Sequence, residues 1–109
     1  MSWIRVTNAA NIPLREGRAV QVGDREIAIF NLGGRYLACD NACPHRGGPL
    51  ADGIVSGDTV VCPLHAYRVC LESGNVTKPD VCIKVDTYEV CIEDGVVLVD
   101  LGEAEEKAA

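Results

Sequence analysis

Residues 43–67 read CPHRGGPLADGIVSGDTVVCPLHAY, and this stretch contains two similar arrangements of one cysteine and one histidine. Cys43 and His45 are separated by one residue, Cys62 and His65 by two, and sixteen residues lie between the pairs. The chain has 2 histidines, so both stand beside cysteines, in segments of proline, glycine and small residues. Thiolate and imidazole are common ligands of zinc and iron. The stretch therefore predicts a metal site built from two segments.

Local geometry can bring the four side chains together. In an extended segment, residues two apart point to the same side, and Pro44 stiffens the chain between Cys43 and His45. A tight turn over 62–65 can orient the second pair in the same way. A hairpin expected over 54–61 can then fold the two loops face to face, so that the ligands are presented at the tip of a β scaffold.

The composition favours a single domain made of strands. A chain of 109 residues is the size of one domain. Apolar residues make up 48% of the sequence and aromatic residues only 5%, so the core must consist of aliphatic side chains. The many valines and isoleucines among them favour strands. We expect one domain over 1–102 and a short acidic, alanine-rich tail over 103–109.

The expected strands are short and are separated by turn residues. They lie at 3–6, 18–22, 25–32, 35–39, 54–55, 59–61, 67–71, 81–85, 88–92 and 96–101. Loops are expected at 40–50 and 62–66, and a proline-containing connection at 76–80. Asp40, Asp52 and Asp58 are interpreted as turn formers. This spacing of strands and turns predicts an all-β, antiparallel sandwich or barrel.

Charge and targeting signals narrow the class of protein. The net charge of −6 argues against nucleic acid as a partner and suits docking to a basic surface of another protein. No run approaches the roughly 18 apolar residues of a membrane helix, and the N-terminus lacks the pattern of a signal peptide. We therefore expect a cytoplasmic protein. In that reducing compartment the 6 cysteines indicate metal binding or catalysis and not three disulfides.

Zinc and iron–sulfur chemistry are the alternatives for the metal. A structural zinc site can hold two cysteines and two histidines, but zinc fingers place the cysteines in one arm and the histidines in the other. Here each arm carries one of each. Mixed arms suit a two-iron cluster, in which both thiolates bind one iron and both imidazoles the other. A structural zinc site, or a chance cluster of disulfide or core residues, stays as the other interpretation.

These residues resemble the Rieske [2Fe-2S] motif, and Pro63 after the second cysteine fits that motif too. The resemblance extends over nearly the whole chain, because the order of strands and turns also resembles a Rieske ferredoxin. It implies a Rieske-type iron–sulfur fold with the cluster held between two loops at one tip. It also implies a 2Fe-2S cofactor whose ligands are Cys43, His45, Cys62 and His65.

The departures from the family pattern bear on the reduction potential. Rieske centres span roughly −150 to +300 mV, against about −400 mV for plant-type clusters. High-potential members carry a disulfide whose cysteines correspond to Gly48 and Leu64, and a serine that corresponds to Tyr67. These absences imply the low-potential, ferredoxin type. Exposed histidine ligands imply a potential that falls at alkaline pH.

Two families of Rieske proteins compete for the finer assignment. The run 43–50, the segment 62–65 and the C-terminal run 78–95 are similar to the small subunit of NAD(P)H-dependent assimilatory nitrite reductase. That resemblance implies a large partner subunit with flavin, an iron–sulfur cluster and siroheme. The alternative is a free ferredoxin that carries electrons from a ferredoxin reductase to a terminal oxygenase acting on aromatic compounds. Either way we expect an electron carrier with no substrate pocket and no catalytic site of its own.

Several other residues are interpreted more simply. Cys39, Cys70, Cys82 and Cys91 are expected to be small buried or half-buried thiols, with a disulfide between Cys82 and Cys91 as the weaker alternative. Glycines 47 and 48 are expected to let backbone N–H groups approach the sulfides. Arg46 is either a docking residue or an ordinary solvated arginine.

Overall fold

The computed structural model describes residues 3–23, 25–33, 35–41, 49–63, 67–78 and 85–100. These residues form ten strands and two single-turn 3-10 helices. In chain order they are β1 (Trp3–Asn8), η1 (Ala9–Asn11), β2 (Gly17–Val22), β3 (Arg25–Asn31), β4 (Tyr36–Asp40), η2 (Leu50–Asp52), β5 (Ile54–Ser56), β6 (Thr59–Val61), β7 (Arg68–Cys70), β8 (Val76–Lys78), β9 (Thr87–Glu93) and β10 (Val96–Asp100). No helix in these ranges is long and apolar enough to cross a membrane.

Six strands form the larger sheet, in the order β1-β10-β9-β4-β3-β2, and every pair is antiparallel. Its edge strands β1 and β2 also contact each other, so the sheet nearly closes on itself. Tight turns set the register of its hairpins. Asp94 and Gly95, for example, both have positive φ, which matches the right-handed twist of the flanking strands β9 and β10.

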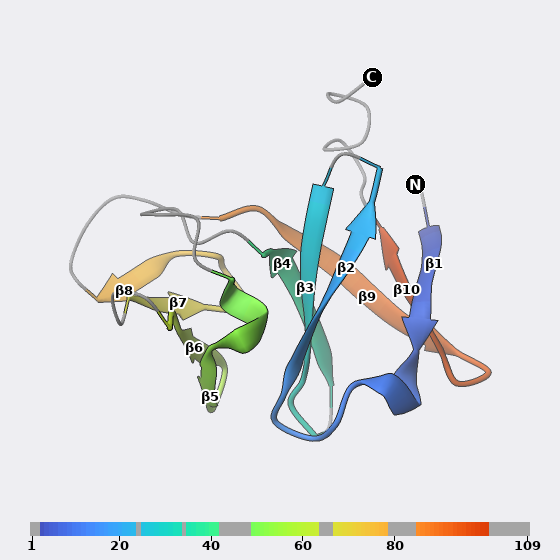
Figure 1. The fold of residues 1–109 in the computed structure, drawn as a ribbon, viewed down its shortest axis with the longest axis horizontal. Helices are drawn as coiled ribbons and strands as arrows, with labels where there is room; N and C mark the ends of the chain where they lie inside the picture. Colours follow the sequence, from blue (N-terminus) through green and yellow to red (C-terminus); the bar gives the residue numbers. More distant parts are fainter. Residues whose placement is uncertain are drawn as a thin grey trace.

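The smaller sheet, β5-β6-β7-β8, is an insertion into the larger one. It lies between β4 and β9 in sequence, although these two strands are neighbours in space, with Ala38 opposite Tyr88 and Cys39 opposite Thr87. Figure 1 shows β5–β8 beside the larger sheet, with η2 between the two. The chain therefore leaves the larger sheet after β4, builds the smaller sheet and returns at β9.

Two groups of buried aliphatic side chains hold these parts together. One group lies within the larger sheet and contains Ile12, Ile27, Ile29, Ala38, Tyr88, Val97 and Val99. The other joins the two sheets and contains Ala28, Phe30, Cys39, Leu50, Ala51, Val60, Cys62, Val69, Leu71, Val76 and Val85. Full burial of a Val, Leu or Phe side chain contributes about 1.5–3 kcal/mol. We call the second group the joint core, because it packs the insertion against the rest of the molecule.

Most strand predictions are confirmed, and three details are corrected. Residues 76–78 form strand β8 and not a connection, because Val76 is buried opposite Val69 of β7. The two 3-10 helices were not expected, since three residues carry no helical period. Of the strand expected at 81–85, only Val85 is described, and it lies outside any strand. The tail over 103–109 lies outside the described residues.

Candidate metal centre

The structure describes one of the four expected ligands. Cys62 follows β6 directly and is buried, with 2% of its surface exposed. Cys43, His45 and His65 lie outside the described residues, as do Arg46, glycines 47 and 48, and Leu64. Within the described ranges no three side chains of His, Cys, Asp or Glu gather at one point. The residues at which each ligand loop begins and ends are described, and we call these flanking residues the loop supports.

Asn41 stands just before the first ligand loop and forms hydrogen bonds with the residues that follow it. The Asn41 N–H donates to the Glu26 carbonyl (2.9 Å), and the Asn41 carbonyl accepts from the Leu50 N–H (2.7 Å). Its side-chain Oδ1 accepts from the Ala51 N–H (2.8 Å) and its Nδ2 donates to Glu26 Oε1 (2.8 Å). Asn41 thus ties the end of β4 to β3 and to the first turn of η2, across the segment that contains Cys43.

The second ligand loop is closed by one backbone hydrogen bond. The Cys62 N–H donates to the Tyr67 carbonyl at 2.7 Å, directly before β7 begins at Arg68. Cys62 itself belongs to the joint core. Cys62 is therefore held at the end of β6, and the joint core shields it from water.

The two loop supports lie side by side because Gly53, the residue after η2, lies directly against β6. A Cβ built on Gly53 would overlap the carbonyl oxygen of Val61 and would lie 2.8 Å from Val60 Cγ2, so the backbones approach as closely as only glycine allows. Leu50, at the end of the first loop, and Cys62, at the start of the second, are both fully buried members of the joint core. The topology therefore brings the described end of the first loop, Leu50, and the described start of the second, Cys62, to one region of the molecule.

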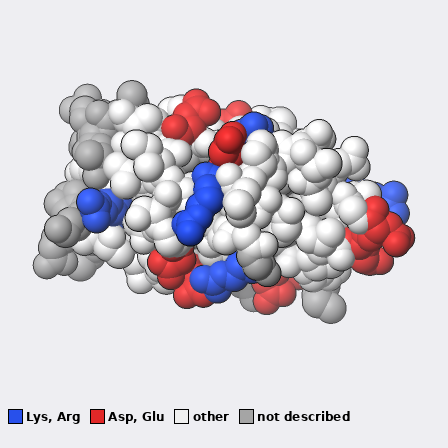
Figure 2. Space-filling model, turned by 90° about the horizontal axis from the view of Figure 1, so that it is seen from below, with Lys and Arg blue, Asp and Glu red and all other residues white. Residues whose placement is uncertain are grey.

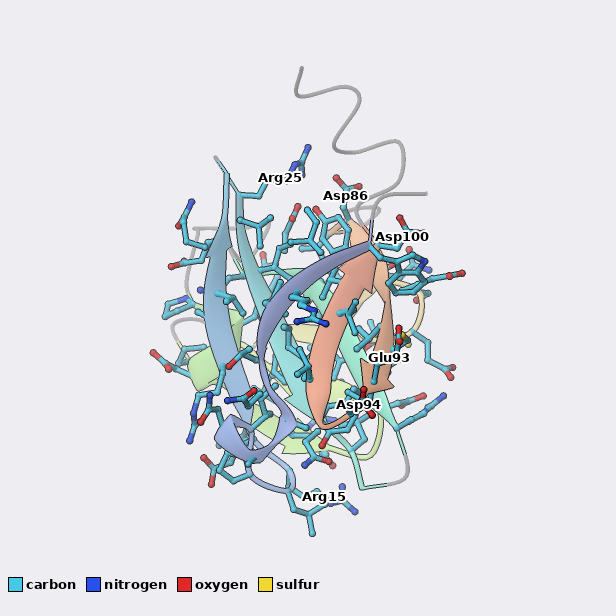
Figure 3. All side chains as sticks on the ribbon, turned by 90° about the vertical axis from the view of Figure 1, so that its right-hand side faces the viewer. Arg15, Arg25, Asp86, Glu93, Asp94 and Asp100 are labelled. Atoms are coloured by element: carbon cyan, nitrogen blue, oxygen red, sulfur yellow. The ribbon has the colours of Figure 1, made fainter. Side chains whose placement is uncertain are left out.

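A polar cluster that the sequence does not reveal lies at the same end of β4. Tyr88 donates its hydroxyl proton to Asp40 Oδ1 (2.5 Å) and accepts from Arg25 Nη1 (2.9 Å). Arg25 also lies 3.7 Å from Asp40 and 3.8 Å from Asp86. Figure 3 shows Arg25 and Asp86 at one end of the larger sheet and Arg15 and Asp94 at the other. Burial, followed by the hydrogen bond to Asp40, raises the pKa of Tyr88 well above its usual range.

The interpretation of Asp40 as a turn former is wrong, and the reason is tertiary. Asp40 is the last residue of β4, opposite Ile27, and its carboxylate is occupied by Tyr88. Asp52 ends η2. Asp58 does lie in a turn, between β5 and β6. The partners of Asp40 are distant in sequence, so local composition could not identify them.

The other cysteines are thiols without a metal-binding environment in the described parts of the chain. Cys39 is buried, Cys70 and Cys91 are half-buried, and all three are unpaired. Burial, with a smaller contribution from Asp40, raises the pKa of the Cys39 thiol to about 12. Cys91 is a free thiol, so the structure contradicts the weaker alternative of a disulfide with Cys82, which itself lies outside the described residues.

Charged side chains of both signs lie on the molecular surface. On the face that Figure 2 draws, single Lys and Arg side chains are interspersed with Asp and Glu. Among the described residues, Arg18 pairs with Glu16 and Arg35 with Glu72. The second pair links the turn before β4 to the turn after β7, across the two sheets.

Comparison with known proteins gives consistent matches over the whole fold. The family model of the Rieske [2Fe-2S] domain matches residues 2–89. The ferredoxin subunit of the 3-phenylpropionate/cinnamic acid dioxygenase of Escherichia coli (strain K12) is 35% identical over 107 residues, which is 96% of this chain and 99% of that protein. Among solved structures, the ferredoxin of Sphingomonas yanoikuyae B1 superimposes with a TM-score of 0.83 at 30% identity, covering 91% of this chain and 98% of its own.

A further solved structure bears on the nitrite reductase resemblance. A protein described as a candidate small subunit of an NADPH nitrite reductase has a TM-score of 0.79 and 18% identity, and covers 92% of this chain and 99% of its own. At that identity the likeness shows the fold alone. The nitrite reductase assignment stays a prediction.

The match to the family model and the identity to a ferredoxin subunit together assign the chain to a family of electron carriers. The chain belongs to the Rieske [2Fe-2S] family. It has the all-β Rieske fold, and its cofactor is a Rieske-type 2Fe-2S cluster, through which it transfers electrons to and from redox partners. The described residues suit that cofactor, since the thiol of Cys62 at the end of β6 provides one of the four expected donors, and the residues that flank both ligand loops are held by hydrogen bonds. Asn41, which the sequence analysis missed, makes the hydrogen bonds that flank the first of these loops.

Proposed function

We propose that this protein is the ferredoxin component of an aromatic-ring oxygenase system. It takes single electrons from a reductase and delivers them to a terminal oxygenase. The observation that supports this is the 35% identity to a dioxygenase ferredoxin subunit over 99% of that subunit's length. The match therefore covers nearly the whole length of that ferredoxin subunit.

The proposed ligands are Cys43 and Cys62 for one iron and His45 and His65 for the other. When bound, the cluster supplies a site that accepts and gives up one electron. The protein's own residues position it: Asn41 holds the ends of the first loop, and the β6–β7 hairpin holds Cys62. We place the protein in the cytoplasm, where its reductase and oxygenase would also lie.

A charge argument concerns how the carrier meets its partners. The chain has a net charge of −6, so a basic surface on the reductase or oxygenase would attract it. Association steered by charge slows as salt increases. We expect the rate of electron transfer to the oxygenase to fall with ionic strength.

The ligand set can be tested by metal analysis of the purified full chain. We expect about two irons and two acid-labile sulfides per chain, with the visible absorbance and EPR signal of a Rieske cluster. His65→Ala and Cys62→Ser should lose the cluster. Cys70→Ser, a half-buried cysteine of β7 outside the motif, should keep it. A preparation that contains one zinc and no visible absorbance would overturn the proposal.

The partner can be tested by a reconstituted electron-transfer assay. The reduced protein is mixed with the oxidised terminal oxygenase of an aromatic-acid dioxygenase, and oxidation is followed by absorbance. Rapid, salt-dependent oxidation supports the oxygenase assignment. No oxidation under these conditions counts against it.

A second candidate function is the small subunit of a nitrite reductase. The C-terminal run 78–95 favours this candidate. Stable co-purification with a large siroheme subunit, together with nitrite-dependent NAD(P)H oxidation by the pair, would support it. Efficient turnover with the oxygenase system and no binding to a siroheme subunit would exclude it.

A further inference from the structure

Asn41 is the one polar residue that is buried in the described part of the chain, with 3% of its surface exposed. It stands directly after β4 and two residues before Cys43. Buried amides cost free energy unless their hydrogen bonds are made. Those of Asn41 are made to Glu26 of β3 and to Ala51 of η2.

The hydrogen-bond partners of Asn41 show which segments of the chain it connects. Its backbone carbonyl and its side-chain Oδ1 accept from two consecutive N–H groups, those of Leu50 (2.7 Å) and Ala51 (2.8 Å). These are the first residues after the segment 42–49. Its N–H and Nδ2 donate to the carbonyl and carboxylate of Glu26 (2.9 and 2.8 Å). One residue therefore connects the two sides of the segment 42–49 and ties them to the start of β3 in the larger sheet.

We infer that Asn41 is a positioning residue for the iron–sulfur cluster, acting through the first ligand loop. The inference rests on the proposed function, in which Cys43 and His45 are ligands. Two residues of chain reach at most about 7 Å, so a displacement of Asn41 passes directly to Cys43. Loss of the amide would also leave the buried Ala51 N–H without its acceptor, which would loosen the far end of the same loop.

The chain contains a matched control for this role. Asn31, at the opposite end of β3, also braces a turn with both ends of its amide. Its Nδ2 donates to the Ile12 carbonyl (2.9 Å), and its Oδ1 accepts from the Gly33 N–H (3.0 Å). Asn31 lies five positions along β3 from Glu26, a distance of about 17 Å. Asn31→Ala should therefore lower stability without affecting the cluster.

The first experiment compares Asn41→Ala with Asn31→Ala in the cluster-loaded full chain. We expect Asn41→Ala to release iron to a chelator roughly tenfold faster than wild type, and to shift or broaden the EPR signal of the reduced cluster. Asn31→Ala should keep both at the wild-type value. Equal iron release and identical EPR signals in the two variants would overturn the inference. Glu26→Ala, at an exposed position, provides a second test if Asn41→Ala does not fold, and should change both readouts in the same direction.

The second experiment reverses the hydrogen bond between the two side chains. Asn41→Asp alone puts two carboxylates face to face and should accelerate iron release. Glu26→Gln alone keeps an acceptor for Asn41 and should have little effect. The double variant lets the new glutamine amide donate to the new carboxylate, and should restore slow iron release and the wild-type EPR signal. Failure of the double variant to recover either readout would contradict the inference.

The proposed function and this inference fail in different ways. If wild type contains no iron and sulfide in Rieske proportions, the proposed function fails and the variants are not needed. If wild type carries the cluster and Asn41→Ala retains it as well as Asn31→Ala does, only the positioning role fails.

Discussion

Tyr88 connects two oppositely charged side chains through one hydroxyl group. The hydroxyl donates to Asp40 and accepts from Arg25, so each charge keeps a polar partner although the region is largely buried. Tyr88 lies on β9, Asp40 on β4 and Arg25 on β3, and the chain leaves the larger sheet after β4 and returns to it at β9. We therefore expect these three polar side chains to hold β3, β4 and β9 together next to the smaller sheet.

Removal of the Tyr88 hydroxyl should destabilise the protein. We expect Tyr88→Phe to lower the free energy of unfolding by about 1–3 kcal/mol, because Asp40 and Arg25 lose a partner in a partly buried site. Tyr36→Phe is the control, since no hydroxyl partner of Tyr36 occurs among the described residues. Urea denaturation of both variants checks this. An equal loss in both would show that the hydroxyl of Tyr88 contributes nothing specific.

The buried thiol of Cys39 predicts a loss of stability at high pH. Its pKa is raised from 9.0 to about 12 by burial, so above pH 9 the unfolded chain releases a proton that the folded chain retains. The free energy of unfolding should therefore fall as pH rises from 9 towards 12, by up to about 1.4 kcal/mol per pH unit from this group. Urea denaturation at several pH values should show a shallower decline in Cys39→Ala. Val60→Ala, also fully buried in the joint core, should lower stability but keep the slope.

At the scale of elements, local signals explain what could be predicted. Hairpin strands such as β5–β6 and β9–β10 follow from turn residues and β-branched runs, and Gly57 and Gly95 have the positive φ that their turns require. β8 was missed because the nearby Pro79 indicates a connection, whereas pairing with β7 decides its structure. The pairing of β4 with β9 joins segments nearly fifty residues apart, and no local pattern encodes it.

The candidate site also has one part that local sequence predicts and another part that depends on distant contacts. The spacing of its cysteines and histidines is local, so the sequence predicts the ligand pairs. The support of the site is not local, because Asn41 acts on Glu26, fifteen residues earlier, and on Ala51, ten residues later. In the sequence it is an ordinary loop asparagine, and only its burial shows its role.

The contact between Gly53 and β6 should be sensitive to a single methyl group. Gly53→Ala would place a Cβ against the Val61 carbonyl and Val60, both on a rigid strand, so we expect a loss of about 1–3 kcal/mol in the free energy of unfolding and faster release of iron. Gly57→Ala, in the turn of the same hairpin, meets no atom within 4 Å and should cost only the strain of its positive φ. Thermal denaturation and chelator assays distinguish the two. A Gly53→Ala variant that releases iron no faster than Gly57→Ala would contradict this account.

At the scale of the whole molecule, stability is divided unequally between the two sheets. The larger sheet has its own buried group and nearly closes on itself, whereas the smaller sheet has strands of three residues and shares the joint core. A four-stranded sheet of such short strands depends on packing its hydrophobic face against another part of the protein. The joint core is one such support, and the cluster, bound through Cys62 and the first loop, would be the other.

Removal of the cluster should therefore loosen the insertion before the rest of the fold. We expect chelation of iron under reducing conditions to increase amide hydrogen exchange in β5–β8 by at least about tenfold, because bound metal contributes its binding free energy to folding. Exchange in β3 and β10 of the same sample is the internal control, since both strands bury side chains within the larger sheet, and should change much less. Mass spectrometry of peptic fragments before and after chelation measures both. A uniform increase across the two sheets would show that the molecule unfolds as one unit, and that the insertion does not depend on its metal more than the remainder does.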